Sequence, residues 1–216
     1  MKAARKNMVD CQIHPNGVIH PAILKAFETV PRELFAPEMV KSVAYGDEDL
    51  PLGNGRFLLA PTVHAKMIQA AEPKADEKVL DVGGGTGYSA AILSSMVGKV
   101  IALEQCADCL EKAGGYWRKL GLHNIESLKG DMTKGEASRA PFDLILVNGA
   151  VAEIPAILAD QLTPEGRMIL ILRNQSETTG KALLVKKTPE GFSSRPLFDA
   201  AASWLPGFEP KPSFKF

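Results

Sequence analysis

The chain has 216 residues, and its 25 basic and 25 acidic residues leave no formal net charge. This length fits one domain with an appendage and a complete hydrophobic core. The balanced charge gives no indication of binding to nucleic acid or to an anionic membrane. Residues 1–15 lack the apolar segment of a signal peptide, no apolar run is long enough to span a bilayer, and the 3 cysteines make no disulfide framework. We therefore expect a cytoplasmic protein.

Residues 1–73 are predicted to form a helical cap and a substrate-side loop rather than an independent domain. A helix is expected from Pro21, because apolar residues recur at helical spacing after it. The stretch 45–61, "YGDEDLPLGNGRFLLAP", is rich in turn residues and is interpreted as irregular. A second helix is expected from Pro61, with Pro73 beyond its end.

Residues 74–216 alternate between short apolar runs and helical patterns, and this alternation predicts an α/β core with a parallel sheet covered on both faces. Strands are expected at 78–83, 99–104, 125–129, 142–148, 166–172, 181–187 and 192–199. Helices are expected at 87–97, 106–120 and 153–161. The terminal "FEPKPSFKF" is interpreted as an extended tail on the surface.

The glycine-rich stretch "VLDVGGGTGYSA", residues 79–90, can be aligned in two registers. From Gly85 it fits the G-x-G-x-x-A pattern of dinucleotide-binding proteins, and from Gly83 it reads G-x-G-x-G. The strand is expected to end at about Gly83, which favours the second register. Asp81, two residues before the loop, would repel a pyrophosphate but tolerates a ligand with an ammonium and a sulfonium group.

An acid at the end of the next predicted strand supports the same ligand. Glu104 can accept hydrogen bonds from both hydroxyls of a ribose, although enzymes that bind NAD also carry an acid there. Together, Asp81, the glycines and Glu104 indicate S-adenosylmethionine (SAM). In "LKGDMTKG", Asp131 follows a third strand, where its carboxylate can reach the adenine amino group; ordinary turn chemistry is the alternative.

Two other patterns are set aside. The Cys106-x-x-Cys109 pair has no second cysteine pair or nearby histidine, so we expect no metal site and interpret the pair as helix packing. Tyr116 and Trp117 are followed by two basic residues, but at helical spacing these rings are expected to pack against the sheet.

The chain resembles a known family, the protein-L-isoaspartate O-methyltransferases. The resemblance is carried by "MVDCQIHPNGVIHPAILKAFETVPRELFAP", by "VLDVGGGTGYSAAILSSMVGKVIALE" and by "PFDLILVNGAVAEIPAILADQLTPEGRMIL". It implies a doubly wound, mostly parallel seven-stranded sheet with an N-terminal helical cap, and SAM-dependent methyl ester transfer to a protein or peptide carboxylate. The predicted cofactor-binding residues are Asp81, Gly83, Gly85, Gly87, Tyr88, Glu104, Gln105, Asp131 and Met132.

The catalytic stretch departs from the family pattern. Where the family reads approximately G-x-G-Q-T-I-S-A-P-H-M-H-A, this chain reads "GNGRFLLAPTVHA", which places Leu59 at the serine position and Phe57 at the threonine position. Arg56, at the glutamine position, is either a bidentate carboxylate clamp or a solvated loop residue. His64 matches the pattern, and the resemblance places it beside SAM, although a histidine on a helix is often a packing residue.

Three hypotheses follow. The first is a SAM-dependent carboxyl methyltransferase with weak or altered isoaspartyl activity. The second is a SAM-binding regulatory or interaction protein of the same fold without this activity, and the third is a nicotinamide-dependent oxidoreductase. The methyl acceptor and the oligomeric state are not predicted.

Overall fold

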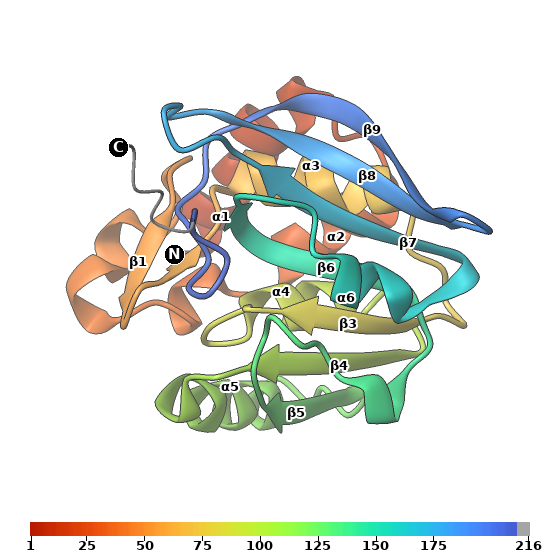
Figure 1. The fold of residues 1–216 in the computed structure, drawn as a ribbon. Helices are drawn as coiled ribbons and strands as arrows, with labels where there is room; N and C mark the ends of the chain where they lie inside the picture. Colours follow the sequence, from red (N-terminus) through yellow and green to blue (C-terminus); the bar gives the residue numbers. More distant parts are fainter. Residues whose placement is uncertain (211–216) are drawn as a thin grey trace.

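A seven-stranded sheet forms the centre of the molecule in the computed structural model, which describes residues 1–210 (Figure 1). Its strands lie in the order β5-β4-β3-β6-β7-β8-β9; the first five are parallel to one another, and β8 and β9 are antiparallel additions. The predicted mostly parallel, doubly wound sheet is therefore confirmed. The strands are β3 (Lys78–Val82), β4 (Lys99–Glu104), β5 (Ile125–Lys129), β6 (Phe142–Val151), β7 (Leu162–Leu172), β8 (Gly180–Thr188) and β9 (Gly191–Ala200).

The helices are short. They are α1 (Lys2–Met8), α2 (Pro21–Thr29), α3 (Pro61–Ala71), α4 (Tyr88–Leu93), α5 (Ala107–Lys119) and α6 (Ala156–Asp160). A π-helix at Val9–Ile13 continues α1, and 3-10 turns lie at His14–Asn16, Arg32–Leu34, Glu38–Val43 and Ala137–Arg139. Within residues 1–210, no helix has both the length and the apolar character needed to cross a membrane.

The side chains of the central strands separate into two buried layers, because successive residues of a strand point to opposite faces. On β3, Val79 belongs to a layer shared with α1 through α5, whereas Leu80 and Val82 belong to a layer covered by α6 and by the last described residues. Phe27 of the helical cap is fully buried in the first layer, so the cap and the sheet share one core.

The stretch interpreted as irregular contains a hairpin, so that prediction was wrong. β1 (Leu50–Gly53) pairs antiparallel with β2 (Arg56–Leu58). The turn consists of Asn54 and Gly55, and these two residues and the preceding Gly53 have positive φ angles of 52°, 68° and 87°, respectively. An Asn-Gly pair is a strong hairpin signal, because both residues tolerate the left-handed region.

Two predicted helices are shorter than expected. The helix expected at 153–161 is reduced to α6, because Pro155 precedes its first residue and fixes an extended backbone there. The helix expected at 87–97 begins at Tyr88 and ends at Leu93. The strands at 142–148 and 166–172 are longer than predicted, since β6 and β7 reach Val151 and back to Leu162.

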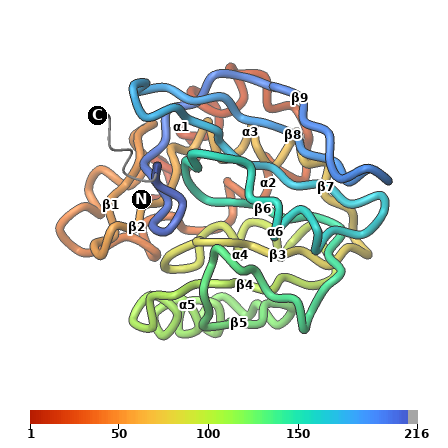
Figure 2. The backbone as a smooth tube through the Cα atoms, in the orientation of Figure 1, coloured from red at the N-terminus to blue at the C-terminus, as the bar shows by residue number. Residues whose placement is uncertain are grey.

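The residues after β9 fold back across the carboxyl ends of the central strands. The Ala150 amide donates to the Ser203 carbonyl, and the Leu205 amide donates to the Ala150 carbonyl, so the segment runs beside the end of β6. Phe208 is buried, which corrects the prediction of a surface tail at its first residue; residues 211–216 lie outside the described part. Figures 1 and 2 show this segment and the β1–β2 hairpin at the left, the side toward which the arrows of β3 and β4 point in Figure 1.

Candidate active site

The glycine loop and Glu104 lie side by side because β3 and β4 are parallel neighbours. Val82 is paired with Leu103 at the ends of the two strands, and the Gly83 amide donates to the Leu103 carbonyl at 2.9 Å. The Gly85 amide then donates to Glu104 Oε2 at 3.1 Å. The loop begins directly after Val82, as the register from Gly83 predicts.

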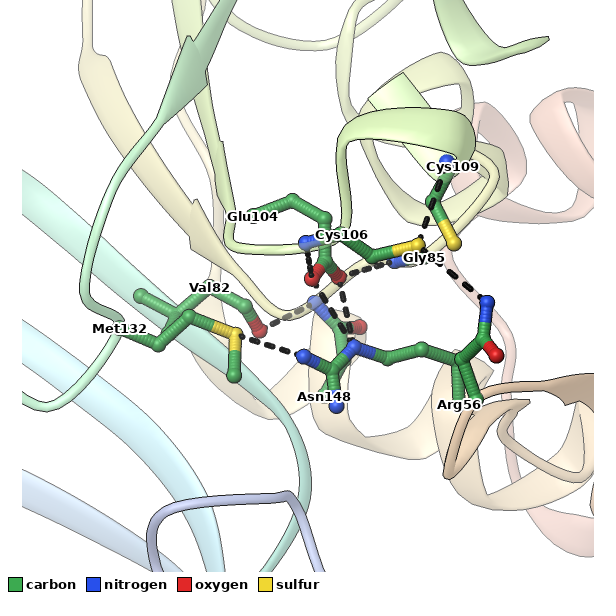
Figure 3. Close-up of polar contacts among 9 residues, drawn as sticks. Arg56, Val82, Gly85, Glu104, Cys106, Cys109, Met132 and Asn148 are labelled. Carbon is green, nitrogen blue, oxygen red and sulfur yellow. Dashed lines mark hydrogen bonds and ion pairs between the residues drawn. The ribbon is translucent and has the colours of Figure 1, made fainter. Parts of the chain in front are cut away.

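The carboxylate of Glu104 is buried and fully hydrogen-bonded. Besides Gly85, the Cys106 amide donates to Oε1 at 2.9 Å, and Arg56 Nε donates to Oε1 at 2.9 Å and to Oε2 at 3.0 Å (Figure 3). The exposed fractions of the Arg56 and Glu104 side chains are both 2%. The two residues thus form a buried ion pair between β2 and the end of β4.

Neither interpretation of Arg56 describes its position. It is not a solvated loop residue, and it points at Glu104 rather than into a substrate-facing space (Figure 3). Its Nη2 lies 3.8 Å from the sulfur of Met132, and its Nη1 is buried without a hydrogen-bond partner among the described residues.

Two leucines lie directly on the glycine loop. A Cβ atom at Gly83 would come within 2.5 Å of Leu205 Cδ1, and one at Gly85 within 2.6 Å of Leu52 Cδ1. Together with Arg56, these side chains cover the loop from the hairpin and from the C-terminal segment.

Asp81 lies beneath the loop in a polar chain. Ser89 Oγ and Asn148 Nδ2 donate to Asp81 Oδ1 at 2.6 and 2.7 Å, whereas Oδ2 is buried without a partner among residues 1–210. Burial raises the pKa of Asp81 to about 6. His64 Nε2 lies 3.3 Å from Ser89 Oγ, and burial, with a smaller contribution from the Arg32 charge, lowers the pKa of His64 to about 3.

A small cavity lies between Leu59 and the side chains of His64, Ser89 and Asn148. Its volume is about 10 Å³, and it is lined by Phe57, Leu58, Leu59, His64, Gly84, Tyr88, Ser89 and Asn148. The Leu59 side chain is buried, and its carbonyl accepts a 2.9 Å hydrogen bond from Arg32. Tyr88 is buried against Phe27 and Phe35, and burial raises its pKa to about 12.

The remaining predicted cofactor residues lie at the ends of β4 and β5. Asp131 is exposed, and its Oδ1 accepts bonds from the amide and hydroxyl of Thr133, which lower its pKa. This is the turn chemistry given above as its alternative. Gln105 is exposed and Met132 is buried. Cys106 caps α5 by accepting the Cys109 amide at 3.3 Å.

Sequence reasoning missed four residues of this region. Asn148 and Ser89 bind Asp81, and Leu52 and Leu205 cover the glycines. For Asn148 a signal was present, because a polar residue follows the apolar run "FDLILV" at a carboxyl strand end. Leu205 had no such signal, since its place depends on how the last segment folds back.

A mostly parallel sheet with a buried acid beside a glycine loop, at the carboxyl ends of neighbouring strands, defines a Rossmann-like cofactor-binding fold, and the family comparison places it among the SAM-dependent methyltransferases. Residues 3–195 match the family model of protein-L-isoaspartate(D-aspartate) O-methyltransferase. The chain belongs to this family, whose members are SAM-dependent protein carboxyl methyltransferases.

Relatives of this name are similar over most of the chain. The protein-L-isoaspartate O-methyltransferase of Desulfosudis oleivorans is 38% identical over 85% of this chain and 83% of its own length. The protein of that name from Ignicoccus hospitalis is 35% identical over 93% of this chain and 96% of its own length. These relatives favour the enzyme over the regulatory-protein and oxidoreductase hypotheses.

Solved structures agree on the fold. A protein-L-isoaspartate O-methyltransferase that is 26% identical superposes with a TM-score of 0.81 over 96% of this chain and 66% of that one. A Plasmodium falciparum structure, in complex with S-adenosyl-L-homocysteine, superposes with a TM-score of 0.78 at 21% identity, over 93% of this chain and 97% of that one.

Proposed function

We propose that this protein transfers the methyl group of SAM to the carboxylate of isoaspartyl residues in proteins or peptides, and that transfer is slow. The observation that carries the proposal is the buried Glu104 carboxylate beside the Gly83–Gly87 loop. Family membership supplies the reaction, and Leu59, at the position of the family serine, is the reason to expect a low rate.

The polar groups at the site fit SAM. Glu104 suits the ribose hydroxyls, and the buried Oδ2 of Asp81, which has no partner among the described residues, suits an ammonium group. Asp131, Gln105 and Met132 are assigned to the adenine side. The space itself is filled by the covering side chains, so the fit requires those side chains to move.

The chain's own residues are suited to alignment rather than to proton transfer. Bound SAM supplies an electrophilic methyl group. The accepting carboxylate is already ionised at neutral pH, so no general base is needed, and His64 is uncharged there because burial lowers its pKa to about 3. Leu59 and Phe57 line the small cavity with apolar groups and offer no hydrogen bond to a carboxylate.

The test is methyl transfer from isotopically labelled SAM to an isoaspartyl peptide, with the same peptide containing normal aspartate as the control. Slow, base-labile labelling of the isoaspartyl peptide alone is expected. If neither peptide is labelled while other carboxylates in a cell lysate are, the enzyme has a different acceptor. If nothing is labelled, the proposed function is wrong.

A further inference from the structure

We infer that Arg56, Leu52 and Leu205 form an internal plug of the cofactor site, and that SAM binds only by displacing Arg56 from Glu104. The inference rests on the proposed function, because it assigns Glu104 to the ribose hydroxyls. In this arrangement the Arg56 side chain competes with the ribose hydroxyls of SAM for the Glu104 carboxylate.

Glu104 has no free acceptor site. Each carboxylate oxygen already accepts two hydrogen bonds, one from Arg56 Nε and one from a backbone amide. A carboxylate has about four lone-pair sites, so this one has none left for a ribose hydroxyl. The two amides, of Gly85 and Cys106, belong to the glycine loop and to the N-cap of α5. Arg56 is the only side chain in the described part of the chain that donates to Glu104, so it is the donor that a ligand must replace.

The space against the loop is also occupied. Leu52 Cδ1 and Leu205 Cδ1 lie within 2.6 Å of the points where a Cβ atom would stand on Gly85 and Gly83. Loops of this kind use glycine so that a ligand can approach the backbone closely. Here the chain's own side chains make that approach.

Arg56 holds Glu104 through a single donor group. A guanidinium has five N–H donors and usually binds a carboxylate through a two-pronged fork. Arg56 uses only its Nε donor on Glu104, its Nη2 contacts a sulfur at 3.8 Å, and its Nη1 is buried without a partner in residues 1–210. Because buried donors without partners are costly, this ion pair is easier to exchange than a fully bonded one.

The two segments that contribute to the plug are joined by hydrogen bonds to one side chain, Asp49. Asp49 accepts the Ala60 amide at 3.0 Å through Oδ1 and the Ser203 amide at 2.8 Å through Oδ2. It therefore ties the end of the hairpin to the segment that carries Leu205. Displacement of Arg56 is expected to loosen both segments together and to move Leu59, which follows β2 directly. The cofactor should therefore bind before the methyl acceptor.

The experiment is calorimetric titration with S-adenosylhomocysteine. This product has no sulfonium charge, so removing an arginine does not favour it by charge alone. Arg56→Gln should lower its Kd by about 10- to 100-fold, because the ribose no longer competes with a bond to a charged group. Arg118→Gln, the same change at an exposed position of α5, is the matched control and should leave the Kd unchanged.

Stopped-flow fluorescence of the two tryptophans tests the wild type and does not depend on whether the variant folds. Trp117 donates to the Gly87 carbonyl at 2.9 Å, and Trp204 lies in the C-terminal segment. The observed binding rate should level off with rising S-adenosylhomocysteine concentration, because opening of the plug becomes limiting. A linear rise up to the highest concentration would overturn the plug.

The outcomes separate the plug from the function. An unchanged or higher Kd for a folded Arg56→Gln would overturn the plug while leaving the proposed function intact. No binding by either protein would overturn the proposed function, and the plug with it.

Discussion

At the scale of single residues, we propose that Leu59 sets the rate of the proposed reaction. Its side chain is buried in the cavity wall, where a serine would offer one hydrogen bond to the acceptor carboxylate. We predict that Leu59→Ser raises kcat/KM on an isoaspartyl peptide by about 10- to 150-fold, the value of one hydrogen bond to a charged group. Leu58→Ser, which removes an equally buried neighbour, is the control and should give no gain. Robust wild-type turnover that Leu59→Ser does not improve would show that Leu59 is only a packing residue. The double variant Leu59→Ser, Phe57→Thr should also be measured, because the effects of neighbouring substitutions on the rate are not independent.

The free energy of unfolding should depend on pH through the ionisation of Asp81. Burial raises its pKa from 3.8 to about 6, so folding favours the protonated acid. The associated stability is present below the unfolded pKa and is lost as the pH rises through about 6, a loss of about 3 kcal/mol. The variant Asp81→Asn has no ionisable group at this position, so it should not lose this stability as the pH rises. The amide oxygen of the new asparagine can still accept the hydrogen bond from Ser89.

The measurement is urea unfolding at several pH values. The free energy of unfolding of Asp81→Asn, minus that of the wild type, should increase by about 2–2.5 kcal/mol between about pH 4 and about pH 7. His64 titrates in both proteins and largely cancels. A difference that does not change with pH would contradict the assigned pKa.

At the scale of elements, α5 packs so tightly against the glycine loop that Gly87 has a structural role as well. Its φ is +90°, and an added Cβ would lie 2.4 Å from Trp117 Cζ2 and 2.8 Å from Ala113 Cβ. Gly87→Ala should therefore destabilise the protein by about 2–5 kcal/mol, the sum of backbone strain and overpacking. Gly121→Ala has a similar φ of +69° with open space around it, so it should cost only about 1–2 kcal/mol. Equal losses in thermal or urea unfolding would show that the packing of α5 is not tight.

The elements also show what the sequence could predict. Five of the seven strands, all except β5 and β9, were found because each contains an apolar run bounded by turns, a pattern set within a few residues. The hairpin was missed although Asn54-Gly55 marks its turn, because Pro51 and the surrounding glycines weigh against a strand. The Arg56–Glu104 pair joins residues 48 positions apart on separate elements, so no local pattern predicts it.

At the scale of the whole molecule, we propose that residues 1–73 are part of one fold with residues 74–216. Phe27 and Met8 of the cap are fully buried in the same layer as Val79 of the sheet. A fragment of residues 74–216 would expose that layer, and a stretch as short as the cap is marginal on its own. The fragment is predicted to unfold without a cooperative transition and to bind SAM weakly. A monomeric, cooperatively unfolding fragment with full-length affinity would contradict this.

The candidate site draws on three distant parts of the chain: the sheet, the hairpin and the segment after β9. The sheet residues Asp81 and Glu104 could be selected from the sequence because they lie at or next to the carboxyl ends of apolar strands. Leu205 was not, since its position depends on backbone bonds between that segment and β6. The sequence thus reveals the chemistry of the site, and the tertiary structure reveals what covers it.

The most direct test of this account is a crystal structure of the protein with S-adenosylhomocysteine. We predict that the ligand lies over Gly83 and Gly85, that its ribose hydroxyls bind Glu104, and that Arg56 has left that carboxylate. A ligand bound elsewhere, with the Arg56–Glu104 pair intact at about 3 Å, would contradict both the assigned site and its plug.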